Sequence, residues 1–241
     1  MLDALLRPPR EVAWLEMLDR GNASREDVAG NLASIARLNR IGPIRSLLIY
    51  LAPFLDRHRG PEPLTVLDVG TGAADIPVAL VRWARTRGRR VSVLALDLQP
   101  DILAIARSRT SAFPEVRLVA GEAMAAPVRA HGVDLAICSL MLHHLSEGAV
   151  VEVLQVMARV TRLGFLVSDL RRSWPAWGSA WLLTRLTSRN RMAHHDGPLS
   201  VRRAYTRAEL SRLSVAAGVP DVSWRHAIAF RVIGIYDRGR G

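Results

Sequence analysis

The sequence lacks lysine altogether. All 33 of its basic side chains are therefore arginine, and they contribute to a formal net charge of +11 at pH 7. A phosphate-binding P-loop ends in Gly-Lys-Ser or Gly-Lys-Thr, so the absence of lysine excludes that kind of nucleotide site. The arginines are spread from Arg7 to Arg240 rather than gathered in one tract. This distribution favours a solvated surface over a nucleic-acid-binding face.

The chain is also poor in cysteine and has no long apolar run. Its single cysteine, Cys138, excludes an internal disulfide framework and fits a reducing compartment. No segment is long enough and free enough of charge to span a bilayer, and no secretory signal is recognisable at Met1. We therefore expect a cytoplasmic protein. Its 241 residues can bury one sizeable core, which predicts one domain with additions.

Apolar runs that alternate with helical patterns predict the fold. The spacing predicts strands over 64–69, 90–98, 116–123 and 164–170, and a strand that leads into a turn over 133–145, separated by helices. Strands this uniformly apolar are typical of a parallel sheet covered on both faces. We therefore expect an α/β fold with a Rossmann-like, doubly wound, mostly parallel seven-stranded sheet, preceded by N-terminal helices and carrying a helical lid insertion after the fifth strand.

This pattern divides the chain into four parts. We expect an N-terminal helical cap over 1–60 and a ligand-binding core over 61–171. The helical lid is expected over 172–205, and a C-terminal helix with closing antiparallel strands over 206–241. In doubly wound sheets, ligands bind beyond the carboxyl ends of the strands. The residues at these strand ends are therefore the candidates for the binding site.

The first strand runs into a glycine-rich turn, "VLDVGTGAAD", at 66–75. A dinucleotide site requires a small residue where Asp75 stands, because a carboxylate there repels the pyrophosphate. S-adenosylmethionine has no phosphate and carries a cationic amino group and a sulfonium, so acidic residues near the turn favour it. We expect Asp68 to hold the amino acid end, while Gly70, Thr71 and Gly72 let the backbone pass close to the ligand.

The next strand ends supply further candidate contacts to the same ligand. Asp97, followed by Leu98, ends the second strand, where a carboxylate can accept both ribose hydroxyls. Glu122 and Ala123 end the third strand and are expected at the adenine amine. Ser139 ends the fourth strand and completes this set.

These motifs together resemble the class I S-adenosylmethionine-dependent methyltransferases over roughly residues 30–172. "LDVGTGAAD", "ALDLQPDILAIAR", "VAGEA" and "DLAICSLMLHHL" are similar to the first four motifs of that family. "SIARLNRIGPIRSLL" further resembles a stretch of the ubiquinone/menaquinone-biosynthesis-type enzymes. That resemblance implies that Asn39 closes over the methionine end of S-adenosylmethionine. "SLML" stands where DNA-base methyltransferases carry an Asn/Asp-Pro-Pro-aromatic tetrad, which disfavours a DNA base as acceptor.

Histidines are the candidate general bases for a methyl transfer. A hydroxyl acceptor has a proton to lose, and histidine is the commonest base for this task. We expect His143 or His195 to be catalytic and His144 to contact the substrate, with helix capping and a polar turn before Gly197 as the alternatives. No cysteine-containing zinc spacing exists, so we expect no metal.

The tryptophan-rich stretch after the fifth strand predicts the kind of acceptor. Trp174, Trp177 and Trp181 share a helical face, and we expect Trp177 and Trp181 to contact an apolar acceptor. Ordinary core packing and a peripheral membrane contact remain open as alternatives.

The resulting hypothesis is S-adenosylmethionine-dependent O-methylation of a small hydrophobic molecule, such as a phenolic, quinone-like or polyketide-like acceptor. C-methylation, a nucleic-acid or protein acceptor, and a binding module without turnover are the alternatives. The oligomeric state is not predicted.

Overall fold

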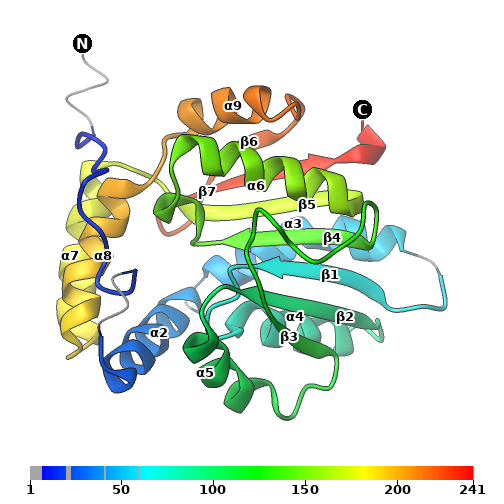
Figure 1. The fold of residues 1–241 in the computed structure, drawn as a ribbon, viewed down its shortest axis with the longest axis horizontal. Coiled ribbons are helices and arrows are strands. Elements are labelled where there is room, and N and C mark those ends of the chain that lie inside the picture. The colour runs from blue at the N-terminus through cyan, green and yellow to red at the C-terminus, as the bar shows by residue number, and fades with distance from the viewer. Residues whose placement is uncertain (1–6, 20–22, 41, 59, 241) are drawn as a thin grey trace.

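The structure is a computed structural model that describes residues 7–19, 23–40, 42–58 and 60–240. Its centre is a seven-stranded sheet with the order β3-β2-β1-β4-β5-β7-β6 (Figure 1). The first five strands are parallel, and β7 is antiparallel to both β5 and β6. The predicted fold class is confirmed. The strands are β1 (Leu64–Val69), β2 (Val91–Asp97), β3 (Val116–Ala120), β4 (Val133–Ser139), β5 (Thr161–Leu170), β6 (Ser223–Ala227) and β7 (Arg231–Asp237).

Helices cover both faces of this sheet (Figure 1). Helices α6 (Glu147–Val160) and α9 (Arg207–Ala216) pack on one face, and α3 (Pro43–Arg57) and α4 (Asp75–Arg85) pack on the other. Helix α5 (Pro100–Thr110) connects β2 to β3. Because both faces are buried, the central strands are almost continuously apolar, as their sequences predicted. The strand order reverses between β1 and β4, where doubly wound folds leave a binding crevice.

The expected helical lid consists of two helices that lie side by side at one edge of the molecule (Figure 1). They are α7 (Trp174–Thr187) and α8 (Arg191–Arg203). Asn190 caps α8 by accepting a 3.1 Å hydrogen bond from the Ala193 N–H. Helix α8 continues through Gly197, where the sequence had left a polar turn open. Its buried side chains, among them Leu199, stabilise the helix by tertiary packing.

The helical expectation for residues 1–60 is met only in part. Helices α2 (Arg25–Arg40) and α3 are present, whereas residues 7–19 form no helix. Pro8 and Pro9 disfavour one at the start of this stretch. We call residues 7–19 the N-terminal segment. Residues 1–6 lie outside the described part of the chain.

The N-terminal segment contacts α8. The Glu11 N–H donates to the Arg202 carbonyl at 3.1 Å. The N–H groups of Met17 and Leu18 donate to the Asp196 carboxylate at 2.8 and 3.2 Å. These contacts join the beginning of the chain to the lid.

Candidate active site

The turn between β1 and α4 has the open backbone that a bound ligand requires. Gly70 and Gly72 have φ angles of 70° and 55°, a left-handed conformation that glycine adopts without steric cost. The N–H groups of Gly70 and Thr71 both donate to the Leu96 carbonyl at 2.9 Å. A Cβ atom on Gly70 would lie 2.7 Å from the Met141 sulfur. The turn therefore packs directly against the segment that follows β4.

Three carboxylates surround this turn. Asp68 is buried, and its Oδ2 has no hydrogen-bond partner in the described part of the chain. Burial raises the pKa of the Asp68 carboxyl to about 7, and the nearby carboxylates of Asp75 and Asp97 act in the same direction. An unpaired buried carboxylate beside two like charges suits a cationic ligand and repels a phosphate.

Backbone amides orient Asp97, the ribose-binding candidate. Its Oδ2 accepts a hydrogen bond from the Gly72 N–H at 2.9 Å, and its Oδ1 accepts one from the Gln99 N–H at 3.1 Å. Both carboxylate oxygens keep further accepting capacity, because each has two lone pairs. Asp97 can therefore accept hydroxyl donors while it also stabilises the glycine turn.

Helix α2 brings Asn39 to the same turn. The Asn39 side-chain amide donates to Asp75 Oδ2 at 2.9 Å and accepts from Arg231 at 2.6 Å. Arg231 belongs to β7, so this chain of hydrogen bonds joins the N-terminal helices to the last strand. The structure thus places Asn39 beside the start of α4, and its closure over the methionine end of S-adenosylmethionine stays a prediction.

A cavity of about 590 Å³ opens at this edge of the sheet, and all ten candidate cofactor residues line it. They are Asn39, Asp68, Gly70, Thr71, Gly72, Asp97, Leu98, Glu122, Ala123 and Ser139. These residues include three carboxylates and no basic side chain, so they suit S-adenosylmethionine. Its cationic amino group would lie near the Asp68 oxygen that has no hydrogen-bond partner in the described part of the chain. Their individual contacts to the cofactor stay predictions.

His143 lies on the wall of the same cavity, on the short 3₁₀ helix η1 (Leu142–His144). It is 3% exposed, and its Nδ1 lies 2.6 Å from Asp169 Oδ1. The other Asp169 oxygen accepts the Leu142 N–H at 2.8 Å. Burial opposes ionisation of Asp169, but the His143 ring lowers the pKa of this carboxyl. With Asp169 accepting from Nδ1, the imidazole presents Nε2 as its free basic nitrogen.

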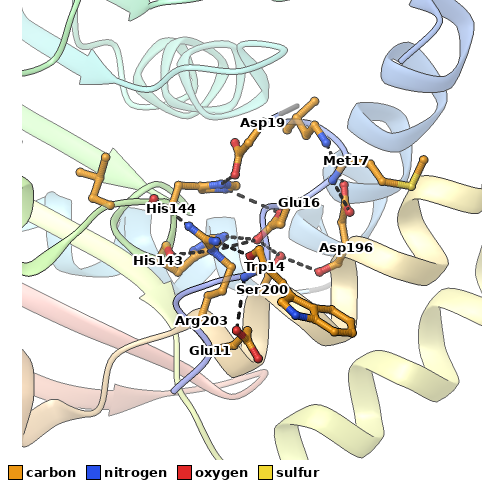
Figure 2. Close-up of polar contacts among 12 residues, drawn as sticks. Glu11, Trp14, Glu16, Met17, Asp19, His143, His144, Asp196, Ser200 and Arg203 are labelled. Atoms are coloured by element: carbon orange, nitrogen blue, oxygen red, sulfur yellow. Dashed lines mark hydrogen bonds and ion pairs between the residues drawn. The ribbon is translucent and has the colours of Figure 1, made fainter. Parts of the chain in front are cut away.

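Figure 2 shows that Glu16, from the N-terminal segment, faces both histidines. Its Oε1 is 3.7 Å from His143 Nε2, and its Oε2 is 3.9 Å from His144 Nε2. The Ser200 hydroxyl donates to Oε1 at 2.8 Å. Burial raises the pKa of the Glu16 carboxyl to about 7. At neutral pH, this buried carboxyl is therefore suited to gaining or losing a proton.

Two more side chains complete the cluster around η1 (Figure 2). Asp19 Oδ2 lies 2.9 Å from His144 Nδ1. Arg203 donates to the backbone carbonyls of His143, His144 and Trp14 at 3.2, 2.9 and 2.6 Å. Arg203 thereby ties η1, α8 and the N-terminal segment together.

The sequence did not identify Glu16, Asp19, Asp169 or Arg203 as site residues. Asp169 had one usable signal, because it lies at the end of the fifth strand, where such sheets bind ligands. The other three come from the N-terminal segment and α8, and only tertiary packing brings those to η1. No local pattern in the sequence indicates that meeting.

Donor atoms of Glu16, His143 and His144 lie within 4.8 Å of one another, close enough to hold a metal ion. The Arg203 guanidinium lies 4.0 Å from Glu16 Oε1 and already supplies positive charge there. The expectation of no metal stays a prediction.

Three candidate residues do not line the cavity. His195 pairs with Asp196 at 2.8 Å, but its side chain is 36% exposed and lies outside the cavity lining. Trp177 and Trp181 do share a helical face, as their spacing predicted, but that face points away from the cavity. Small residues of α7, including Ala176 and Ala180, line it instead. Helix α7 packs on α8 and turns Ala176 and Ala180 toward the cavity, while Trp174 and Trp181 are exposed on its other side.

Among the residues that the structure describes, no helix has both the length and the apolar character needed to cross a membrane.

Comparison with known proteins gives matches that centre on the cofactor half of the chain. The family model described as "Methyltransferase domain" matches residues 66–164. The demethylmenaquinone methyltransferase of Bacillus licheniformis is 30% identical over 115 residues, which are 48% of this chain and 47% of that protein. The malonyl-[acyl-carrier protein] O-methyltransferase of Methylococcus capsulatus is 30% identical over 128 residues, covering 50% of this chain and 45% of that protein. The chain thus spans about half the length of the curated relatives it matches.

A solved structure extends the likeness in fold to most of the chain. Human N-acetylserotonin methyltransferase in complex with S-adenosylmethionine superposes with a TM-score of 0.64 at 16% identity. The match covers 89% of this chain and 56% of that one. The sheet order, the acidic glycine turn and these matches together support a class I S-adenosylmethionine-dependent methyltransferase, and the family match itself covers residues 66–164.

Proposed function

We propose that the protein methylates an oxygen atom of a small hydrophobic acceptor, with His143 as the general base. The observation that carries this proposal is the His143–Asp169 pair on the wall of the cavity that also contains the cofactor candidates. When bound, S-adenosylmethionine supplies an electrophilic methyl group on a sulfonium and leaves as a neutral thioether. The protein then has to orient the acceptor and take up its proton.

His143 is equipped to take that proton. Asp169 holds the Nδ1–H and stabilises the imidazolium that forms when Nε2 gains a proton from the acceptor hydroxyl. Glu16 Oε1, 3.7 Å from Nε2, can take the proton onward, because burial raises its pKa to about 7. His144, which contacts Asp19 and lies on the same cavity wall, is a candidate for acceptor binding.

The inner face of α7 is the candidate acceptor surface. Ala176, Ser179, Ala180 and Leu183 line the cavity, and these small or apolar side chains leave room for a hydrophobic ring or chain. We therefore assign acceptor contact to this face in place of Trp177 and Trp181. A cavity of about 590 Å³ falls in the range of small-molecule sites.

The names of the two relatives give different acceptors, and only one of them states the atom methylated. The Methylococcus relative is named for O-methylation, whereas the Bacillus relative is named for a demethylated menaquinone. Carbon methylation of a phenolic or quinol ring is therefore the second candidate, and it could use the same base. A nucleic-acid or protein acceptor fits this cavity less well.

Methyl-labelled S-adenosylmethionine tests the proposal. The purified protein would be incubated with alkylphenols, alkylresorcinols and quinols, and with duplex DNA and transfer RNA in parallel. We expect a labelled methoxy group in the NMR spectrum of a phenolic product. A label on a ring carbon would replace the oxygen assignment, and a label only on nucleic acid would overturn the proposed acceptor class.

A further inference from the structure

The outer face of α7 is apolar and exposed. Trp174, Trp181, Leu182 and Leu186 are 47%, 42%, 49% and 72% exposed. Helix α7 contains no acidic residue, and its one charged side chain, Arg185, lies with its guanidinium 4.2 Å from the centre of the Trp181 ring. A surface helix of a soluble domain normally turns a polar face to water. An exposed apolar face of this kind is typical of a surface that binds a protein partner, a ligand or a membrane.

A basic groove adjoins the carboxyl end of the same helix. It has a volume of about 1670 Å³, and helices α2, α3, α4 and the connection between α7 and α8 line it. Eight arginines contribute to the lining, among them Arg45, Arg82 and Arg189, while Asp75 is its one acidic residue. Asp75 is already hydrogen-bonded to Asn39. The groove therefore carries a large excess of positive charge.

Arg185 and Leu186 belong to both features, so the apolar face and the basic groove are continuous. Helices that lie at the surface of an anionic bilayer typically expose tryptophan and leucine beside arginine. A nucleic acid would account for the groove but not for the apolar face. An apolar ligand would account for the face but not for the arginines.

We propose that the outer face of α7 and the adjoining arginine groove dock the protein on an anionic lipid surface. The apolar side chains enter the acyl boundary, and the arginines contact lipid phosphates. Leu183, on the same helix, lines the acceptor cavity and is 43% exposed. If the acceptor of the proposed function carries an apolar chain, docking would let that acceptor enter the cavity directly from the lipid surface. The docking itself does not depend on that reaction.

Vesicle flotation with the full chain tests the docking without cofactor or acceptor. We expect the protein to float with vesicles of phosphatidylcholine and phosphatidylglycerol and to bind phosphatidylcholine alone at least tenfold more weakly. Added salt should weaken binding, because it screens the arginine contacts. Equal binding to both vesicles, or no binding to the anionic ones, would overturn the proposal.

Matched variants separate the face from general surface effects. Leu182→Glu with Leu186→Glu should reduce binding to anionic vesicles at least tenfold. Val215→Glu is the control, because Val215 is 63% exposed on α9, which lies away from α7 (Figure 1). Arg45→Ala and Arg189→Ala should each reduce binding about fivefold, whereas Arg129→Ala, an exposed position outside the groove, should not.

Unchanged thermal unfolding and unchanged S-adenosylmethionine binding would establish that these variants fold. The proposal is overturned if the α7 variant binds vesicles as well as Val215→Glu does. It is equally overturned if duplex DNA or transfer RNA binds more tightly than the anionic vesicles and displaces them. A failure of methyl transfer leaves these measurements unaffected, so the two proposals are tested separately.

Discussion

The two sides of the cavity are built in different ways. Each candidate cofactor residue on the sheet stands within a short stretch at the end of a strand, such as Asp68 near the end of β1 and Asp97 at the end of β2. The proposed acceptor side combines the N-terminal segment, η1, the end of β5 and the lid helices. Glu16 and Ser200 meet there although they are far apart in the sequence. The first side follows from local sequence, whereas the second depends on tertiary packing.

The strongest test of this comparison is removal of the base. His143→Ala should lower kcat on a hydroxyl acceptor by roughly 10²- to 10⁴-fold, because the variant lacks the general base that takes up the acceptor's proton. Cofactor affinity, measured by calorimetry, should stay within a few-fold, since the cofactor side is built separately. His195→Ala is the matched control and should retain nearly full kcat. A loss of cofactor binding in His143→Ala would mean that the two sides are not independent.

The converse test removes a contact on the cofactor side. Asp97→Ala should weaken S-adenosylmethionine binding by about 1.5–3 kcal/mol, or roughly 10- to 150-fold, through lost hydrogen bonds to a charged group. Calorimetry with S-adenosylhomocysteine should show a similar loss. Nicotinamide dinucleotides should bind the unmodified protein much more weakly, and comparable binding would contradict the acidic-turn assignment.

The third test uses the pH dependence of cofactor affinity. Below about pH 7 the ligand-free protein holds a proton on Asp68, because the pKa of this carboxyl, about 7, lies above the ordinary 3.8. A cationic ligand favours the ionised form, so affinity should fall as pH drops below about 7, by up to about tenfold per unit, and level off above it. Calorimetry in buffers of different ionisation enthalpy would detect the released proton. The Asp68→Asn variant should bind S-adenosylmethionine more weakly, and its affinity should no longer depend on pH in this range. If the pH dependence persists in that variant, another group causes it.

The same proton gives stability without ligand the opposite pH dependence. Between pH 3.8 and about 7 the folded protein holds this proton while the unfolded chain has released it. The contribution of Asp68 to the free energy of unfolding therefore falls as pH rises through that window. Glu16, whose pKa is also raised to about 7, contributes in the same direction.

The smallest expected effect distinguishes the two faces of α7. Ala180→Leu should raise the acceptor KM about fivefold or more, because added methylenes in a filled site cost about 1–3 kcal/mol. Trp181→Ala, on the outer face, should change that KM less than twofold. Cofactor affinity should be unchanged in both. If Trp181→Ala had the larger effect, the tryptophan prediction made from the sequence would be restored.

The sequence predicted most of the fold because strands and helices have local periodic signals. The five parallel strands and the acidic glycine turn at Asp68 were predicted close to where they lie. The N-terminal segment was not, since Pro8 and Pro9 interrupt the pattern and its partners are on α8. The tryptophans of α7 were predicted as a helical face, but periodicity cannot say which side of a helix faces the core. Glu16 had no local signal at all.

The contacts of Asp196 and Arg203 with the N-terminal segment have a consequence for the timing of assembly. During synthesis the segment is made before β5, whereas its partners on α8 are made only after β5 is complete. The strands that carry the glycine turn can pair earlier. A nascent chain should therefore be able to form most of its candidate cofactor surface before it can form the proposed proton-accepting cluster, which needs the N-terminal segment to meet α8.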